Sequence, residues 1–369
     1  MAKTLKILLS EHGLPDSKNG SWTQRLKYFL ESNYNVFDYV VCGPTASKQK
    51  LSTVETIYCK VINNRLALKL FPNIKYNNFM KPLKDLISKH DEVLICVMDN
   101  IRLNNELSLF LEQNNLQSKV NIIFYNCGYS YFLEDREHKT FCKHIDEIIF
   151  LTKSAYDYNK NKYSEFVPKV SILHNPVDKN QFKIPSHDVK ETLRKEHKLQ
   201  GKTVFLWLSH NRPKKGLNIV LDAWSQWAKD RTDVELLIVG VNSKANIKNV
   251  RFLGRIPSNE VHVFYKLTDV YLFPTLWKEG FGLSLAQAIS SGCYCIAADN
   301  GGVKDYISKT DGQLIENPNF INEWISGLDQ AYSAINKGWK NDNAGAQILS
   351  VEQWSQKFAE ILVNCKTRN

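Results

Sequence analysis

The sequence predicts an α/β protein with two domains, each a parallel β-sheet covered by helices. Three observations support this. The chain of 369 residues is longer than one hydrophobic core usually organises. Apolar strand-like runs alternate with helical segments, and a polar stretch at Lys179–Gln200 interrupts the alternation. Strands that are apolar throughout suit parallel sheets with both faces buried. We therefore expect two doubly wound, Rossmann-like domains that face a central cleft beyond the carboxyl ends of their strands.

The N-terminal domain is expected over residues 1–178. Its predicted strands are Lys6–Leu9, Val36–Val41, Thr56–Val61, Glu92–Met98, Asn121–Tyr125 and Glu147–Leu151. A helix is predicted at Ser21–Glu31, because its apolar residues recur at helical spacing, and another at Ser154–Lys162, with Ser154 as its cap. The strand that begins near Ser171 runs into a turn at Asn175 and Pro176, and the domain boundary is placed after Asp178.

The second domain is expected over residues 179–350, where the alternation starts again. The predicted strands are Thr203–Leu208, Val234–Val239, Val250–Leu253, Asp269–Phe273 and Cys293–Ala298. The predicted helices are Leu217–Ala228, Glu260–Lys266 and Leu283–Ser291. No short-period repeat relates the two halves.

Charge and composition narrow the class of protein. The net charge is +10, and the excess is even, with 24 cations against 19 anions on the N-terminal side through Asn180 and again in the remainder. Such a spread suits anionic ligands or an anionic membrane surface, or simply a solvated basic surface, and it is weak evidence for nucleic-acid binding. With 43% hydrophobic residues, disorder is excluded as the main state, and no apolar run is long enough to span a membrane.

The cysteines and the N-terminus predict a reduced, cytoplasmic protein. The eight cysteines show no Cys-x-x-Cys pair and no histidine at zinc-site spacing. Cys96 and Cys295 lie in apolar runs, where a thiol behaves as a small hydrophobe. The N-terminal residues have only a short apolar stretch before Glu11, which indicates a first strand rather than a signal peptide.

The most informative segment is Phe273–Ala288, where a strand end runs into a helix that begins near Leu283. Gly280 and Gly282 let the backbone approach a ligand, and the first N–H groups of the helix attract an anion such as a diphosphate. The carboxylate of Glu279 would repel phosphate but suits the hydroxyl groups of a sugar. Gln287 lies about two turns further on. The alternative is that the glycines serve packing and that Glu279 is a solvated cap.

Two other segments place polar or basic residues after strands. In Ser209–Gly216, the cations Arg212, Lys214 and Lys215 follow a strand end, where they could grip a pyrophosphate or form an ordinary solvated turn. In the loop after the first strand, Gly20 precedes a helix and could bring amides to an anion, although a Gly-Ser helix start is a weak signal.

Together these segments resemble family 4 of the retaining nucleotide-sugar glycosyltransferases (GT4), which have the two-domain GT-B architecture. The resemblance is densest over Val204–Ile307. The family's Glu-x7-Glu motif around Gly-Phe-Gly reads here as Glu279, Gly280-Phe281-Gly282 and Gln287. The other matching segments are Phe252–Pro257, Ser291–Ala297, Asn300–Asp305, His174–Asp178 with Phe182, and Ser350–Trp354. The last resembles a segment whose helix, about 351–369, returns to the N-terminal domain.

The resemblance implies roles for individual residues. Lys215, assisted by Arg212, would bind and neutralise the donor's diphosphate, and Glu279 would hold hydroxyls of the transferred sugar. The backbone amides of Phe281, Gly282 and Leu283 would meet the phosphates, with Gly280 allowing close approach. Ile256 would contact the base, Gln287 the ribose, and Gly20 the diphosphate from the N-terminal domain. The resemblance also implies retention without a protein nucleophile, no metal and no cofactor, and polysaccharide or glycoconjugate synthesis.

Three positions depart from the family pattern. The second Glu is Gln287, which loses charge assistance to the ribose bonds. The Arg that precedes the Lys is replaced by Ser209 or His210, and a His that orients the sugar is replaced by Cys127. An inactive or weak nucleotide-sugar-binding protein is therefore the alternative to a transferase. An epimerase on the same fold is disfavoured, because no carboxylate and histidine are clearly placed for proton abstraction.

The acceptor is expected to be a glycan or a lipid-linked molecule bound by the N-terminal domain. The aromatic and basic candidates for acceptor or peripheral membrane contact are Trp22, Arg25, Lys27, Tyr28, Lys81 and Lys84. An ordinary amphipathic surface helix is the alternative for this group.

Overall fold

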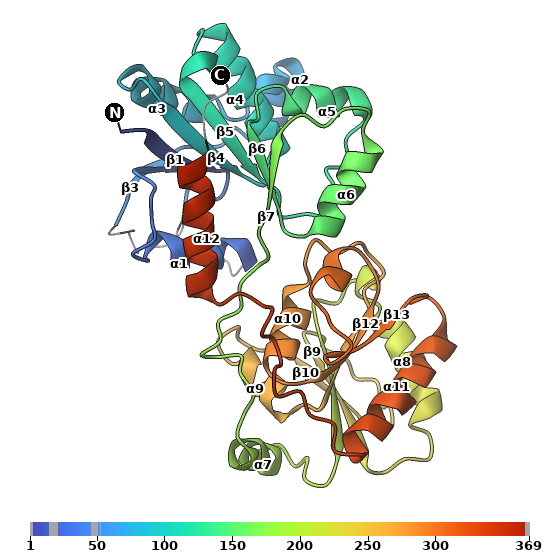
Figure 1. Ribbon diagram of the computed structural model, residues 1–369. Coiled ribbons are helices and arrows are strands. Elements are labelled where there is room, and N and C mark those ends of the chain that lie inside the picture. Colours follow the sequence, from blue (N-terminus) through green and yellow to red (C-terminus); the bar gives the residue numbers. More distant parts are fainter. Residues whose placement is uncertain (1–2, 15–20, 46–50, 52, 366–369) are drawn as a thin grey trace. The chain divides into compact units, whose positions relative to one another are not determined.

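The computed structural model describes residues 3–14, 21–45, 51 and 53–365 (Figure 1). The chain divides into two compact units. The first contains residues 1–174 together with 351–369, and the second contains residues 175–350. Each unit has its own parallel sheet and is described by itself.

The sheet of the first unit is parallel throughout and has the strand order β3-β2-β1-β4-β5-β6-β7. Its strands are β1 (Leu5–Ser10), β2 (Tyr39–Cys42), β3 (Glu55–Tyr58), β4 (Val93–Met98), β5 (Val120–Tyr125), β6 (Glu147–Phe150) and β7 (Lys169–Ile172). Its helical segments are α1 (Ser21–Leu30), α2 (Arg65–Leu70), η1 (Pro72–Ile74), α3 (Asn77–Ser88), α4 (Ile101–Gln113), η2 (Gln117–Lys119), α5 (Asp135–Cys142), α6 (Lys153–Lys162) and α12 (Val351–Asn364).

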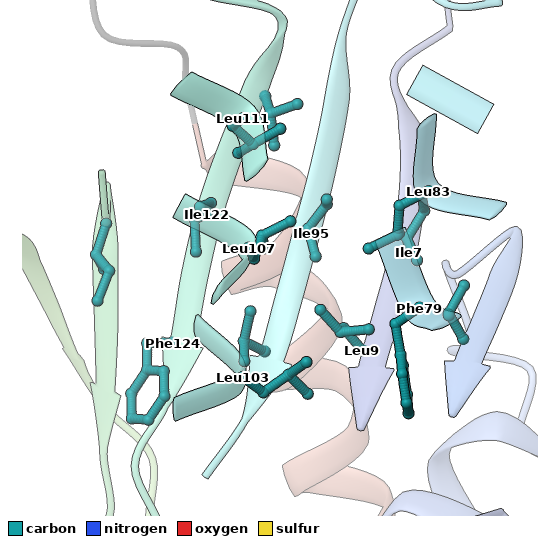
Figure 2. Close-up of a cluster of buried hydrophobic side chains, with 14 of the residues drawn as sticks. Ile7, Leu9, Phe79, Leu83, Ile95, Leu103, Leu107, Leu111, Ile122 and Phe124 are labelled. Carbon is teal, nitrogen blue, oxygen red and sulfur yellow. The ribbon is translucent and has the colours of Figure 1, made fainter. Parts of the chain in front are cut away.

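One core layer of this unit lies between the sheet and the helices on one of its faces. Figure 2 shows Ile7, Ile95 and Ile122, from three neighbouring strands, beside the apolar face of α4 at Leu103 and Leu107. β4 and β5 are buried along their whole length, as parallel strands covered on both faces require. On α12, Trp354 and Phe358 pack against Phe29 of α1, with ring centroids 6.0 and 4.8 Å apart.

The second unit has a six-stranded parallel sheet in the order β10-β9-β8-β11-β12-β13. Its strands are β8 (Thr203–Leu208), β9 (Val234–Val239), β10 (Val250–Gly254), β11 (Val270–Phe273), β12 (Tyr294–Ala298) and β13 (Gly312–Ile315). Its helical segments are α7 (His187–Glu196), η3 (Pro213–Lys215), α8 (Leu217–Trp227), α9 (Val261–Leu267), α10 (Leu283–Ser290), η4 (Gly302–Asp305) and α11 (Ile321–Asn336). Trp207, Trp224 and Trp324 are fully buried in its core.

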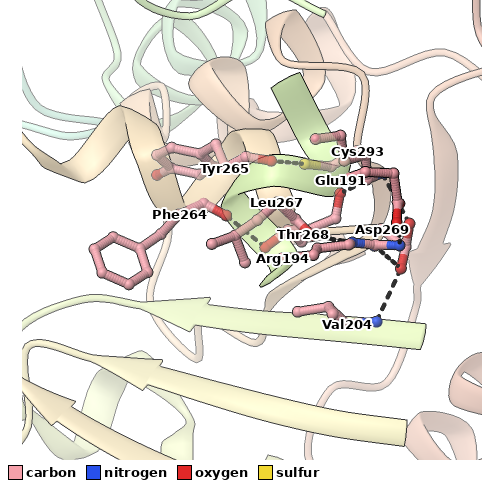
Figure 3. A network of polar contacts seen from close by, with 10 residues as sticks. Glu191, Arg194, Val204, Phe264, Tyr265, Leu267, Thr268, Asp269 and Cys293 are labelled. Carbon is pink, nitrogen blue, oxygen red and sulfur yellow. Dashed lines mark hydrogen bonds and ion pairs between the residues drawn. The ribbon is translucent and has the colours of Figure 1, made fainter. Parts of the chain in front are cut away.

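A charged network ties α7 to the amino end of β11 (Figure 3). The carboxylate of Asp269 is almost buried, and its Oδ2 accepts from the backbone N–H of Val204 at 2.9 Å. It also forms ion pairs with Arg194 and with Lys190, the latter at 2.8 Å. Arg194 donates in addition to the carbonyl of Leu267 at 3.1 Å. The buried charge is therefore balanced by two cations of one helix and by the backbone of β8.

The structure corrects several details of the sequence predictions. The cap of α6 is Thr152, whose side chain accepts from the N–H of Ala155, so the helix begins before the expected Ser154. β2 begins at Tyr39 rather than Val36, because the preceding residues form a turn in which Asn35 Oδ1 accepts from the N–H of Phe37 at 3.0 Å. No helix of the described part of the chain is long and apolar enough to cross a membrane.

Candidate functional site

The candidate site lies at the carboxyl edge of the second sheet, where the neighbouring strands β8 and β11 end. The two strands pair in parallel, with Phe205 opposite Val270 and Trp207 opposite Leu272. The loops that follow them therefore leave the sheet side by side. They are joined by a backbone hydrogen bond of 2.8 Å from the N–H of Leu276 to the carbonyl of Lys214.

Gly216 makes this contact between the loops possible. Its backbone is left-handed, with φ +68°, and it closes η3 before α8 begins. A Cβ at this position would lie 1.9 Å from the carbonyl oxygen of Pro274, which no side chain tolerates. The absence of a side chain at this glycine therefore allows the η3 backbone to contact the loop after β11 closely. Lys215, which precedes it, is held by a 3.3 Å hydrogen bond from the indole of Trp207 to its carbonyl.

Lys215 and Glu279 form an ion pair across the two loops. Their side chains are 25% and 17% exposed, so water reaches the pair but does not surround it. The buried hydroxyl of Thr275 donates to the same carboxylate oxygen, Oε1, at 2.9 Å. The pair places an ammonium group and a carboxylate next to each other at the strand ends, where one can bind an anion and the other can accept hydrogen bonds from hydroxyl groups.

The backbone of Glu279 is fixed by the segment after β12. The N–H of Glu279 donates to the carbonyl of Asn300 at 3.3 Å, and the N–H of Gly302 donates to the carbonyl of Glu279 at 2.9 Å. Gly301 has φ +82°, and a Cβ there would lie 2.4 Å from the carbonyl oxygen of Glu279. The side-chain amide of Asn300 donates to the carbonyl of Thr275 at 2.8 Å. Glu279 is therefore held at both its backbone and its side chain.

Thr275 and Asn300 were missed as site residues by the sequence analysis. Thr275 stands two positions after the last residue of a buried strand and four before Glu279, and this placement was the available signal. Asn300 belongs to a segment that the family resemblance included. Its side chain, however, binds the backbone carbonyl of Thr275, and a residue pattern does not reveal a contact of this kind.

The loop Gly280–Gly282 leads from Glu279 directly into α10. Gly282 is the N-cap, with φ +85°, and its carbonyl accepts from the N–H groups of Leu285 and Ala286 at 3.0 and 3.2 Å. The ring of Phe281 is buried and stacks on Tyr306, with centroids 4.4 Å apart. Tyr306 donates to the carbonyl of Gly282 at 3.1 Å, and burial raises its pKa well above the usual value, so it stays a donor. The start of α10 is thereby held in a fixed orientation.

Other predicted site residues lie further from the ion pair. Arg212 is exposed at the start of η3, and its guanidinium is not in the Lys215–Glu279 contact. Ile256 is half-buried in the loop after β10, two strands away from β8 on the same edge. The side chain of Gln287 accepts from the hydroxyl of Tyr265 at 3.4 Å, which directs it toward α9. Gly20 lies outside the described residues.

In the first unit, Cys127 follows β5 at the carboxyl edge of that sheet. Its N–H donates to Asp99 Oδ1 at 2.7 Å, and Arg25 Nη2 donates to its sulfur at 3.4 Å. Burial raises the pKa of the Cys127 thiol to about 12, so it is neutral at physiological pH and is no proton acceptor.

Arg25 is not the surface contact that the sequence suggested. Only 4% of it is exposed, because its guanidinium lies over the rings of Tyr125 and Trp354, at 5.1 and 5.4 Å from their centroids. This cation helps to fix α12 on the first unit and is not available to a membrane.

The described residues contain no cluster of three or more His, Cys, Asp or Glu side chains placed to hold a metal ion. The charged groups of the candidate site are thus cations of the η3 turn and one carboxylate, together with the amides that open α10.

Comparison with known proteins finds a family model that matches part of the second unit. Residues 189–337 match the family model described as glycosyl transferases group 1. The phosphatidyl-myo-inositol mannosyltransferase of Mycobacterium leprae is 33% identical over 107 residues, which are 27% of this chain and 29% of that protein. The match therefore spans less than a third of the length of this curated relative. A lipopolysaccharide 1,2-N-acetylglucosaminetransferase of Salmonella typhimurium is 22% identical over 228 residues, 55% of this chain and 59% of that protein.

Solved structures resemble almost the entire chain in fold. Anabaena HepE in complex with UDP has a TM-score of 0.72 at 15% identity and covers 98% of this chain and 100% of its own. Sucrose-phosphate synthase from Thermosynechococcus elongatus has a TM-score of 0.67 at 15% identity, with 98% and 95% covered.

Proposed function

We propose that the protein is a hexosyltransferase, because residues 189–337 match the family model of glycosyl transferases group 1 and the fold is the GT-B fold. Its donor is a UDP- or GDP-sugar, and its acceptor is a glycan or a lipid-linked glycan used in cell-surface polysaccharide or glycoconjugate synthesis. The observation that carries this proposal is the Lys215–Glu279 pair beside the glycine loop that opens α10.

The donor is bound through its charges and its hydroxyl groups. The ammonium of Lys215 leaves Glu279 in part to meet the diphosphate, and the amides of Gly282 and Leu283 bind phosphate oxygens at the helix start. Glu279 then accepts hydrogen bonds from sugar hydroxyls, while the hydroxyl of Thr275 continues to donate to its Oε1. Arg212 adds positive charge at the rim of the site, and Ile256 supports the base.

The proposed transfer retains the configuration at the anomeric carbon. The bond from this carbon to the diphosphate oxygen breaks, the acceptor oxygen forms the new bond on the same face, and the acceptor's proton passes to the departing phosphate oxygen. No protein nucleophile takes part. Lys215 and the α10 amides stabilise the charge that develops on the leaving group, and Glu279 positions the sugar. Because these groups supply the neutralisation, activity is expected to persist in EDTA.

A weakly active or inactive sugar-nucleotide-binding protein is the second candidate function. Two observations favour it: Gln287 replaces a carboxylate, and the neutral thiol of Cys127 replaces a histidine. Both functions require donor binding, so only turnover separates them.

The test combines nucleotide binding with turnover. UDP and GDP are titrated calorimetrically into the wild type, Lys215→Ala, Glu279→Ala and the exposed-lysine control Lys229→Ala. Release of nucleoside diphosphate is then followed with the common UDP-, GDP- and ADP-sugars. We expect Lys215→Ala to weaken nucleotide binding at least tenfold, because a charge-assisted contact is worth roughly 1.5–3 kcal/mol.

The results of these two measurements distinguish an active transferase from an inactive binding protein. Glu279→Ala is expected to bind the nucleotide nearly as the wild type does but to lose release of the nucleoside diphosphate. Binding without turnover in the wild type, at a rate no higher than in Glu279→Ala, identifies the inactive protein. Failure of every nucleotide to bind, or equal binding by Lys215→Ala and the wild type, contradicts the proposed donor site.

A further inference from the structure

The segment 63–74 of the first unit exposes large apolar side chains close together in the sequence. α2 and η1 contain no buried residue. Leu66 is 76% exposed, Leu70 is 74% exposed and Phe71 is 61% exposed. Leu66 and Leu70 are four positions apart on one helix face, and Phe71 is adjacent. Among the described residues, no other two exposed large apolar side chains lie this close in sequence.

Hydrogen bonds from backbone and side chains hold this segment in place, so its apolar side chains are exposed on a structured element. The N–H of Ile62 donates to the carbonyl of Lys75 at 3.0 Å and closes the segment at its base. The side chain of Asn64 caps α2 by accepting from the N–H groups of Leu66 and Ala67 at 3.0 and 3.1 Å. Arg102 of α4 donates to the carbonyl of Pro72. Figure 1 shows α2 at the periphery of its unit.

The chain segment that contains this face carries charges of one sign. Residues 56–84 contain no Asp or Glu and six cationic side chains, which are Lys60, Arg65, Lys69, Lys75, Lys81 and Lys84. Lys75 is paired with Glu11 at 2.8 Å. Arg65 and Lys69 are exposed on α2 itself, next to the two leucines, and Lys81 is exposed on the following helix. Apolar tips flanked by Lys and Arg are typical of helices that lie at a membrane interface.

We propose that α2 and Phe71 form a docking surface for an anionic lipid bilayer. Leu66, Leu70 and Phe71 enter the boundary between headgroups and acyl chains, while Arg65 and Lys69 stay at the level of the anionic headgroups. The membrane hypothesis drawn from the sequence named residues of α1, of which Arg25 is buried, together with Lys81 and Lys84 of α3, and it did not include α2 or Phe71. The proposal does not depend on the transfer reaction.

The bilayer is favoured over a protein partner because this face has both features that a bilayer requires, exposed apolar side chains and neighbouring cations. A bilayer needs protruding apolar side chains without a fixed complementary shape, and its anionic lipids attract every nearby cation additively, by roughly a fivefold gain in binding for each Lys or Arg near the surface. A soluble acidic protein would be bound equally in the absence of lipid, which makes the two occupants separable by experiment.

The experiment is flotation of the full chain with vesicles, without any sugar donor. Vesicles of phosphatidylcholine with about one third phosphatidylglycerol are compared with vesicles of phosphatidylcholine alone, at roughly 0.1 M and 0.5 M salt. The apolar variant is Leu66→Ser/Leu70→Ser/Phe71→Ser, and its control is Phe320→Ser, which changes a phenylalanine of similar exposure (63%) in the second unit. The charge variant is Arg65→Gln/Lys69→Gln, and its control is Lys229→Gln/Lys309→Gln, at two other exposed positions.

The wild type is expected to float with anionic vesicles and to lose most of this binding at high salt. The apolar variant is expected to lose binding at least tenfold and the charge variant by roughly tenfold or more, whereas both controls float as the wild type does. Far-ultraviolet circular dichroism and urea denaturation establish that each variant is folded. Absence of wild-type flotation, equal flotation of the α2 variants and their controls, or binding only to an acidic soluble protein overturns the proposal. None of these results bears on the donor site, which the nucleotide titrations test separately.

Discussion

Replacing Gly216 by alanine isolates the close contact on which the candidate site is built. The new Cβ would lie 1.9 Å from the carbonyl oxygen of Pro274, where ordinary contact begins at 3.4 Å, so the two loops must separate by roughly 1.5 Å. The chain contains a matched control. Gly201 has the same φ of +68° but nothing within 4 Å of its built Cβ, so Gly201→Ala tests the left-handed backbone without the clash.

The expected losses follow from the contacts that each change disturbs. A left-handed alanine costs about 1 kcal/mol in either variant. In Gly216→Ala, the separation also weakens the 2.8 Å bond between Leu276 and Lys214 and the 3.3 Å bond from Trp207 to Lys215. At about 1 kcal/mol for each hydrogen bond, the total reaches about 3 kcal/mol. The Lys215–Glu279 pair is displaced as well, so nucleotide binding is expected to fall about tenfold only in this variant.

Two measurements decide the outcome. Urea denaturation gives the loss of unfolding free energy, and hydrogen exchange of peptides from β8 and β11 assigns this loss to the second unit. Calorimetric titration with UDP or GDP gives the loss of affinity. Equal destabilisation by Gly201→Ala and Gly216→Ala, or unchanged nucleotide affinity in Gly216→Ala, would refute the reasoning that this glycine sets the geometry of the site.

Three further predictions concern charge and pH. Asp269→Asn removes the charged partner of two cations of α7 and is expected to lower the unfolding free energy by about 3 kcal/mol. The control is Asp329→Asn, which replaces a carboxylate that is 65% exposed and is expected to cost under about 0.5 kcal/mol; equal losses of the two variants in urea denaturation contradict the role of the network. Burial lowers the pKa of His138 to about 4, so the unfolded chain takes up this proton at a higher pH than the folded chain, and stability is expected to fall by about 2.5 kcal/mol as pH drops from about 6.5 to 4. Thermal unfolding should show this loss in the wild type and in the exposed-site control His187→Gln but not in His138→Phe, and a pH slope in His138→Phe that matches the wild type contradicts the assignment. Gln287→Glu is expected to tighten UDP or GDP binding about fivefold if this side chain meets the ribose, and an unchanged calorimetric affinity excludes that contact.

The strands of the second unit were predictable because they are apolar along their whole length. β8 and β9 have the bounds that the sequence indicated, since both faces of the central strands are buried and no alternation is needed to recognise them. The helices of the first unit were harder to predict. α3 buries apolar residues at helical spacing, but Pro82 in its interior argues against a helix when the sequence is taken alone. α2 has no buried face, so its sequence does not show the pattern of an amphipathic helix that packs on a core.

The site was predictable where chemistry and spacing coincide and not where it depends on distant contacts. The sequence singled out Lys215 and Glu279 separately, and the structure brings them together through strand order, because β8 neighbours β11. Arg25 was misjudged for the same reason. Sequence alone suggests that a cation in a polar helix lies at the surface. The tertiary fold places its guanidinium against Tyr125 and Trp354, which are distant in the sequence.

The bridge between Val177 and Ser350 gives the second unit a property useful to protein engineers. The N–H of Val177 donates to the carbonyl of Leu349 at 2.9 Å, so the points where the chain enters and leaves this unit are adjacent. Residues 175–350 are thus a segment inserted within the sequence of the first unit, and the backbone hydrogen bond between Val177 and Leu349 joins its two ends; we call this segment the cassette. The cassette can be excised for separate expression, and a short Gly-Ser joint can span the gap that it leaves, because neither cut requires a stretched connection.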